Sequence, residues 1–248
     1  MAAPVLILQE IDSTNAEARR RAEAGEFGPL WIGAKSQTDG RGRRGRVWDT
    51  DSGNLAQTLL LTLNKTPAEA AQLTFVAALA VYDLVARYVP PCLVSIKWPN
   101  DVLLDGKKVS GILLESGSLG AGYLWLAIGI GVNLKVEPLG TERPATCIAD
   151  HLNADQANAP AFEDAAHALA ETFDHWFNIW QVQGFATVLK AWIERSPGIF
   201  GPCIARLTNE TIEGVADGVE ADGALRLRVS DGTIRIVSAG DVFFGVNA

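Results

Sequence analysis

Residues 93–133, LVSIKWPNDVLLDGKKVSGILLESGSLGAGYLWLAIGIGVN, decide the fold of the first part of the chain. Short apolar runs separated by turn residues predict strands rather than helices. Asp105-Gly106 is typical of a tight hairpin turn between two such runs. The predicted strands are Leu93–Trp98, Val102–Leu104, Val109–Glu115 and Tyr123–Asn133.

Strands and helices alternate before this stretch. Thr14 and Glu17 have capping-box spacing, which predicts a helix that Gly25 ends. Thr66, Pro67 and Glu69 supply the N-cap, N1 proline and N3 glutamate of a second capping box, which begins a longer apolar helix that continues to Val89. The predicted strands here are Val5–Leu8, Leu30–Ser36 and Leu55–Leu63, with a long loop over Gly40–Gly53.

The sequence pattern changes from helical to strand-like near residue 197. Phe162–Trp180 and Phe185–Glu194 are predicted helices, and Pro197-Gly198 follows them. Five short runs then fill about fifty residues, as in a small β-barrel. These runs are Ile204–Leu207, Thr211–Val219, Ala224–Val229, Thr233–Val237 and Val242–Phe244. We therefore expect two domains, residues 1–197 and 198–248.

Composition excludes several classes of protein. The 248 residues include 21 Lys and Arg against 29 Asp and Glu, a net charge of −8, which disfavours nucleic acids and anionic membranes as general partners. Cys92, Cys147 and Cys203 lie far apart, so we expect buried thiols in a reducing compartment. Without a recognisable signal peptide or membrane span, we expect a cytoplasmic protein.

Positive charge is concentrated in residues 40–46, Gly-Arg-Gly-Arg-Arg-Gly-Arg. Glycines let the backbone approach a ligand, and arginines present planar donors to phosphate or carboxylate. The segment also fits G-x-G-x-x-G, but no helix pattern follows it, as a dinucleotide-binding fold requires. Ligand binding and a merely solvated loop both remain open on this segment alone.

Four further segments carry polar groups at strand or helix ends, and each has a structural alternative. Lys97–Asp101 and Lys107–Glu115 could simply form turns. Ile128–Asn133 places glycines at alternate strand positions, which either clears a face for a flat ligand or serves sheet packing. Asp12–Asn15 could bind an anion at a helix start or only cap that helix.

Taken together and in order, these segments resemble the biotin protein ligases. The resemblance rests on Ser13-Thr14-Asn15, Gln37 to Trp48, Lys97–Asp101, Lys108 to Leu113, and Gly129 to Asn133. It implies an α+β fold, with helices packed on a mixed β-sheet as in class II synthetases, followed by an SH3-like barrel. Ser110 replaces a common alanine of the family. The winged helix of members that repress transcription is not expected.

The resemblance implies an ATP-dependent ligase. Biotin and ATP would give biotinyl-5′-AMP and pyrophosphate, and a carrier lysine would then take the biotinyl group. ATP and Mg²⁺ are the implied cofactors, with no certain protein ligand for the metal. The implied partner is the biotin carboxyl carrier protein of acetyl-CoA carboxylase or a related carboxylase. A homodimer formed through edge strands is a further expectation.

The same resemblance assigns residues to roles. Lys108, Arg41 and Arg43 are the expected catalytic residues, with Lys108 acting as a cation. The biotin site would comprise Ser13, Thr14, Asn15, Gln37, Gly40, Arg41, Lys108, Gly111 and Leu113. The nucleotide site would comprise Arg41, Gly42, Arg43, Arg44, Arg46, Trp48, Lys97, Asn100, Asp101, Lys108, Gly131 and Asn133.

Three other functions are weighed against this one. A lipoate–protein ligase shares the fold, but its R-R-x-x-G-G-G signature is missing. A non-catalytic biotin-binding protein would keep the pocket without releasing pyrophosphate. A nucleic-acid module would use the arginines and bind in a strongly salt-dependent way.

Overall fold

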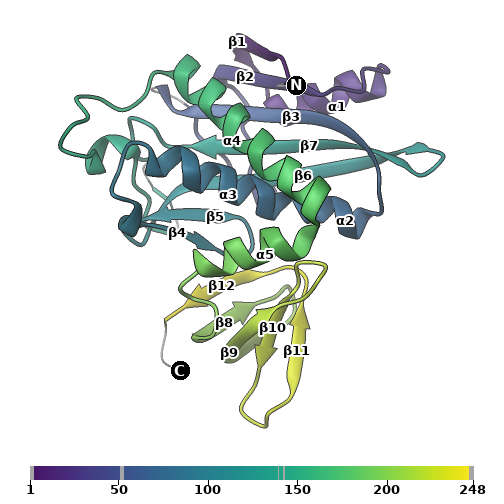
Figure 1. The fold of residues 1–248 in the computed structure, drawn as a ribbon, viewed down its shortest axis with the longest axis vertical. Helices are drawn as coiled ribbons and strands as arrows, with labels where there is room; N and C mark the ends of the chain where they lie inside the picture. The colour runs from purple at the N-terminus through teal and green to yellow at the C-terminus, as the bar shows by residue number, and fades with distance from the viewer. Residues whose placement is uncertain (1–2, 51–52, 139, 142, 246–248) are drawn as a thin grey trace.

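The computed structural model describes residues 3–50, 53–138, 140–141 and 143–245. A larger unit of sheet and helices lies above a smaller β-sheet along the long axis (Figure 1). The predicted combination of a mixed sheet, packed helices and a small C-terminal β-domain is confirmed.

Seven strands form the larger sheet in the order β1-β2-β3-β7-β6-β5-β4. β1 and β2 are parallel, and the other neighbours are antiparallel. Asp105 and Gly106, with φ of 51° and 72°, make the predicted turn between β5 and β6. The strands are β1 (Val5–Ile11), β2 (Leu30–Gln37), β3 (Leu55–Asn64), β4 (Val94–Lys97), β5 (Asp101–Leu104), β6 (Lys107–Gly120) and β7 (Tyr123–Val132).

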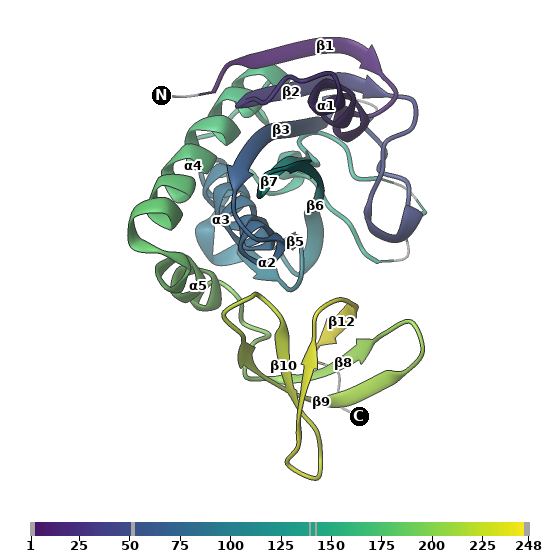
Figure 2. The ribbon, with the colours of Figure 1, turned by 90° about the vertical axis from the view of Figure 1, so that its right-hand side faces the viewer.

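Helices cover the two faces of this sheet unequally (Figure 2). α2 (Pro67–Ala71), α3 (Leu73–Ala86) and α4 (Phe162–Gln183) pack on one face and enclose the main hydrophobic core. α1 (Thr14–Glu23) lies on the opposite face, against β3 and β7. α5 (Phe185–Glu194) follows α4 towards the smaller sheet. Much of the face beside α1 is therefore left for a site.

The two predicted capping boxes have different outcomes. Thr66 and Glu69 form one, and the helix after it is divided at Gln72. The box predicted for Thr14 and Glu17 is wrong, because Ser13 is the cap residue and Thr14 hydrogen-bonds elsewhere. Pro67–Ala86 is long and apolar enough to cross a membrane by composition, but most of it is buried in the core.

Five antiparallel strands form the smaller sheet in the order β11-β10-β9-β8-β12. The indole of Trp98 donates to the carbonyl of Gly223 (3.0 Å), and Gln72 donates to that of Ala221 (3.1 Å), so this sheet is tied to the larger unit. The strands are β8 (Pro202–Arg206), β9 (Thr211–Val219), β10 (Leu225–Arg228), β11 (Ile234–Val237) and β12 (Asp241–Phe244).

The prediction that the cysteine thiols are buried is correct for two of the three. Cys147 and Cys203 are buried, and burial raises the pKa of each thiol to about 11. Cys92 is exposed, because it lies in a short turn, Pro91–Leu93, at the surface before β4.

Candidate active site

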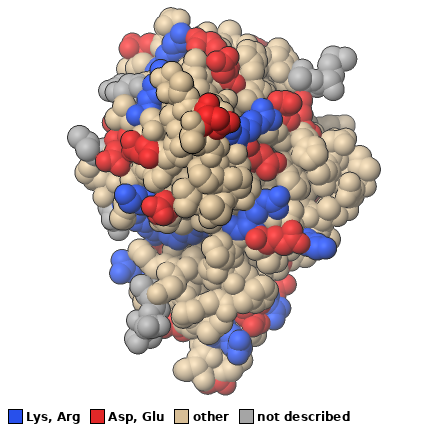
Figure 3. Space-filling model, turned by 60° about the vertical axis from the view of Figure 1, so that its left-hand side comes forward, with Lys and Arg blue, Asp and Glu red and all other residues tan. Residues whose placement is uncertain are grey.

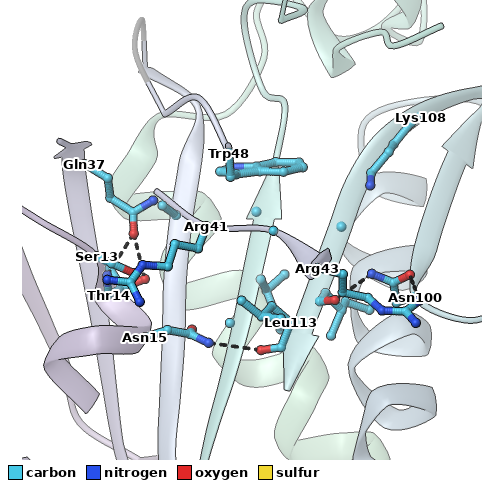
Figure 4. Close-up of a pocket in the computed structure, with 17 residues that line it drawn as sticks. Ser13, Thr14, Asn15, Gln37, Arg41, Arg43, Trp48, Asn100, Lys108 and Leu113 are labelled. Atoms are coloured by element: carbon cyan, nitrogen blue, oxygen red, sulfur yellow. Dashed lines mark hydrogen bonds between the residues drawn. The ribbon is translucent and has the colours of Figure 1, made fainter. Parts of the chain in front are cut away.

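A first cavity opens on the face of the sheet beside α1 (Figure 4). Its walls come from the start of α1, the loop after β2, the first part of β3 and β6, and the last part of β7. Its lining includes the predicted residues Ser13, Thr14, Asn15, Gln37, Arg41, Gly42, Arg43, Trp48, Asn100, Lys108, Gly111, Leu113 and Gly131. Segments far apart in the sequence thus meet in one place.

One end of this cavity is a chain of hydrogen bonds. The side-chain carbonyl of Gln37 accepts from the backbone N–H of Thr14 (2.8 Å) and from its hydroxyl (3.1 Å). Thr58 of β3 lies 2.8 Å from the Thr14 hydroxyl and 2.7 Å from the side-chain oxygen of Asn15. The amide nitrogen of Gln37 donates to Thr50 (2.8 Å). This end can therefore both donate to and accept from a ligand with polar atoms.

The position of Asn15 explains why residue 129, the first of the two alternating glycines in Ile128–Asn133, is a glycine. Its amide donates to the carbonyl of Leu113 (3.2 Å) and to Glu115 (2.8 Å), which fixes α1 onto β6. A Cβ at Gly129 would overlap the Asn15 side chain. Gly129 is therefore required for packing, and only Gly131 clears space in the cavity itself.

Trp48 covers the cavity. A Cβ at Gly131 would overlap its indole, and a Cβ at Gly111 would come within 3.2 Å of it. The ammonium of Lys108 lies 5.7 Å from the ring centre. About 50 Å³ remains free under this cover, which is room for a few water molecules but not for a bicyclic ring system. The indole must move outward for a ring system to enter.

The arginine-rich segment, residues 40–46, forms a closed turn against the cavity. The N–H of Gly42 donates to Arg46 (2.7 Å), and the N–H of Trp48 donates to Gly40 (2.9 Å). Arg43 donates to the side chain of Asn100 (2.9 Å), which links the turn to the start of β5. Of the predicted loop, residues 51–52 lie outside the described residues.

A second cavity of about 520 Å³ joins the first through Gly42, Arg43, Trp48 and Lys108. Lys108 forms an ion pair with Asp101 (2.6 Å) between the two spaces. Asn133 donates to the carbonyl of Thr146 (2.9 Å), but its buried side-chain oxygen has no partner among the described residues. The buried Nε of Arg143 has none there either. Buried unpaired groups that line a cavity are suited to a polar ligand.

Charge in this region is strongly positive. Burial, and then the charge of Arg143, lower the pKa of Lys97 to about 8. Burial also lowers the pKa of Arg43. Burial would raise the pKa of Asp241, but the hydrogen bond from Arg46 and the charges of Arg143 and Arg44 outweigh it and lower that pKa. An anion that enters here meets several guanidinium groups.

Some predicted residues lie beside the cavities rather than in their linings. Gly40 packs against Trp48 and Gln37, where a Cβ would collide. Arg44 pairs with Asp241 (3.0 Å), and Lys97 lies over the ring of Phe243 (5.6 Å). By contrast, three other predicted residues do line a cavity, but only the second one: Arg46, Asp101 and Asn133.

The sequence reasoning missed two functional candidates. Arg143 lines the second cavity from an irregular segment that has no periodic pattern. Thr58 follows Gln57, and these two polar residues interrupt the apolar residues in the buried part of β3, a contrast that could have identified Thr58.

Known proteins are similar to this chain in sequence and in fold. Residues 9–133 match the biotin/lipoate A/B protein ligase family, and residues 198–245 match the biotin protein ligase C-terminal domain. The chain belongs to the biotin protein ligase family. A biotin–[acetyl-CoA-carboxylase] ligase of Paracoccus denitrificans is 42% identical over 241 residues, which cover 96% of this chain and all of that protein. As a member of this family, the chain is an enzyme of the ligase class.

Other members of the family differ in length or are known as structures. A bifunctional ligase/repressor of Escherichia coli is 29% identical over 96% of this chain and 73% of its own length. An Aquifex aeolicus ligase bound to biotin and ATP shares the fold, with a TM-score of 0.77, 24% identity and coverage of 98% and 99%. A Leishmania major ligase bound to biotinyl-5-AMP has a TM-score of 0.62, 26% identity and coverage of 95% and 99%.

Proposed function

We propose that this ligase joins biotin to AMP from ATP and then transfers the biotinyl group to a lysine of a biotin carboxyl carrier protein. The observation that carries the proposal is the junction of the two cavities at Arg43 and Lys108. The full-length relative from Paracoccus and the Leishmania structure with biotinyl-5-AMP support the same substrates.

Biotin would occupy the first cavity. Ser13, Thr14 and Gln37 offer the donors and acceptors that its cyclic urea needs when it leaves water. Gly111 and Gly131 would leave room for its flat ring system once the Trp48 indole has moved outward. The carboxylate would then point towards Arg43 and Lys108, because these cations line the far end of the same cavity.

Adenylate formation needs charge neutralisation more than proton transfer. A carboxylate oxygen of biotin attacks the α-phosphorus of ATP, and the bond from that phosphorus to pyrophosphate breaks. Arg43, Arg46 and Lys108 line the second cavity and would hold the phosphate oxygens while negative charge shifts onto the leaving group. The unpaired oxygen of Asn133 would accept a hydrogen bond from the nucleotide.

Magnesium would enter as MgATP. Asp49 and Asp101 are the carboxylates of the described lining of the second cavity, and Asp101 pairs with Lys108. No group of three metal-ligating side chains occurs among the described residues. This donor set fits an ion held mainly by phosphates and water, as Mg²⁺ usually is. The ion would neutralise phosphate charge.

We also infer a cytoplasmic location, since the three cysteines are free.

The test is incubation with biotin, MgATP and a carrier domain, followed by mass measurement of the carrier. The expected product is a carrier that is heavier by one biotinyl group, together with AMP and pyrophosphate. Parallel incubation with lipoate separates the two branches of the family. An unchanged carrier mass with biotin, or modification by lipoate alone, would contradict the proposal.

A further inference from the structure

A third cavity lies between the larger unit and the smaller sheet. Its volume is about 340 Å³. One wall comes from the α2–α3 region and β6, and the other from the turn at Asp222–Ala224 and from Ser238. Most of the lining is apolar and includes Phe75, Trp98, Pro99, Ile112 and Leu114. The hydrogen bond from Trp98 to Gly223 holds the two walls together.

The three cavities converge on one side chain. Arg43 lines all of them. Asn100 and Ile112 line both the first and the third, so these two spaces meet where Asn100 accepts a hydrogen bond from Arg43. The third cavity therefore reaches the same point as the proposed biotin and nucleotide sites, but from the boundary between the larger unit and the smaller sheet.

We infer that the third cavity receives the side chain of the acceptor lysine, together with the carrier turn that presents it. The inference rests on the proposed function, which requires three substrates to meet at one atom. Biotin and ATP would fill the first two cavities, and the third would offer the amine a separate approach to the same point. Its apolar walls match the four-carbon stem of lysine, and its outer wall gives the smaller sheet a part in carrier binding.

The surroundings of this route suit the chemistry of the amine. A lysine ammonium with an ordinary pKa of about 10.4 cannot attack, so its proton must be released to solvent on entry. Asp222 on the outer wall attracts the incoming ammonium, whereas the apolar walls and the charge of Arg43 at the inner end favour the neutral amine. The amine nitrogen then bonds to the carbonyl carbon of biotinyl-AMP, and the C–O bond to AMP breaks. AMP leaves with the electron pair, and the nitrogen releases its extra proton.

Filling the cavity tests the route. Ala71 and Ser238 are exposed residues on opposite walls, so Ala71→Trp and Ser238→Trp block the space without disturbing the core. Both should slow transfer from preformed biotinyl-AMP to the carrier at least tenfold. Biotin-dependent pyrophosphate–ATP exchange should stay within twofold, as should transfer to hydroxylamine, which is too small to need the cavity. Ala186→Trp on α5, which lines none of the three cavities, is the matched control.

The outcomes of this experiment distinguish a failure of the lysine route from a failure of the proposed function. Carrier transfer in the two variants equal to that of Ala186→Trp would overturn the inference. Loss of pyrophosphate exchange in them would overturn it too, because the walls would then serve the first step. Absence of exchange in the unaltered chain would count against the proposed function and not against this route.

A second variant tests the electrostatic part of the argument. Thr74 lies on the cavity wall in the first turn of α3, where an acidic residue is well tolerated. Thr74→Glu should favour the ammonium form and move the pH midpoint of carrier transfer upward, with exchange unchanged. Thr74→Gln should leave the midpoint in place. Equal midpoints in both variants would contradict a lysine in this cavity.

Discussion

The side chain of Lys108 makes several of the contacts that hold this site together. It pairs with Asp101, lies over Trp48 and lines both the first and the second cavity. Asp101 is almost fully buried, so this ion pair holds the ammonium where two substrates would meet. Lys107, the preceding residue, is exposed and lines none of the three cavities.

Lys108→Met should therefore slow both adenylate formation and transfer. Loss of one charge-assisted hydrogen bond costs about 1.5–3 kcal/mol, or roughly a 10- to 150-fold loss of rate. Pyrophosphate exchange and single-turnover transfer from preformed biotinyl-AMP measure the two steps separately. Lys107→Met should behave like the unaltered chain, and equal losses in the two variants would remove the assigned role.

Lys97 makes stability depend on pH. Burial holds its folded-state pKa at about 8, whereas the unfolded chain keeps about 10.4. Between these values the unfolded state binds more protons, so this residue makes the unfolding free energy rise with pH. The stability of the unaltered chain minus that of Lys97→Met should increase from pH 7 to pH 9.5. Urea unfolding at both pH values measures it, and a flat or falling difference would contradict the lowered pKa.

At the scale of elements, β7 and the loop that carries Trp48 enclose the first cavity together. Ile128, Ile130 and Val132 face the helices, so the residues between them face the site. A side chain at Gly131 would take the space that the Trp48 indole now occupies. Because side chains alternate between the two faces of β7, residue 131 faces the cavity, and its lack of a side chain determines how deep the cavity is.

Gly131→Ala should weaken biotin binding at least tenfold while the fold is retained. The added methyl group displaces Trp48 and reduces a space that is already small. Isothermal titration with biotin measures the loss. Gly201→Ala is the control, because a Cβ there makes only ordinary contact. Unchanged affinity in Gly131→Ala would show that the ring system binds elsewhere.

The turn itself should respond to ligands. Trp48 must move outward before biotin enters and can close over it afterwards, so amide exchange in residues 40–48 should slow when biotin and ATP are both present. Hydrogen exchange with and without the two ligands measures the change. Equal protection in the two states would contradict closure over the adenylate.

At the scale of the whole molecule, the smaller sheet contributes charge to the nucleotide side of the site. Asp241 of β12 pairs with Arg46 (2.6 Å), Arg44 (3.0 Å) and Arg143 (3.6 Å). The ring of Phe243, on the same strand, lies 4.5 Å from the guanidinium of Arg143. Basic side chains gather along the boundary between the two lobes (Figure 3).

Asp241→Asn should raise the KM for MgATP about fivefold and leave that for biotin within twofold. Arg46 and Arg143 line the second cavity and lose the carboxylate that holds them, at a cost of about 1 kcal/mol for a partly exposed cluster. Asp241→Glu should restore part of the affinity. Asp217→Asn, which breaks a similar cluster with Arg226 and Arg228, is the control. A lower KM for MgATP would instead mean that Asp241 competes with phosphate.

Local pattern alone predicted most elements of this fold. Val5–Leu8 extends to Ile11 as β1, and Phe185–Glu194 has the bounds that were expected. β6 is longer than Val109–Glu115, because its Ser- and Gly-rich end pairs with the start of β7. Strand pairing, which no local pattern contains, decided that extension.

The sequence by itself determined the strands and helices, the concentration of arginines, and the order of segments that resemble a biotin protein ligase. These features depend on periodicity, turn chemistry and composition, which act over a few neighbouring residues. Only the tertiary structure decided that Arg143 and Asp241 meet near the nucleotide side of the site, and that Arg43 lines three cavities. Those relations join residues up to about two hundred positions apart, and sheet order and domain packing alone bring them together.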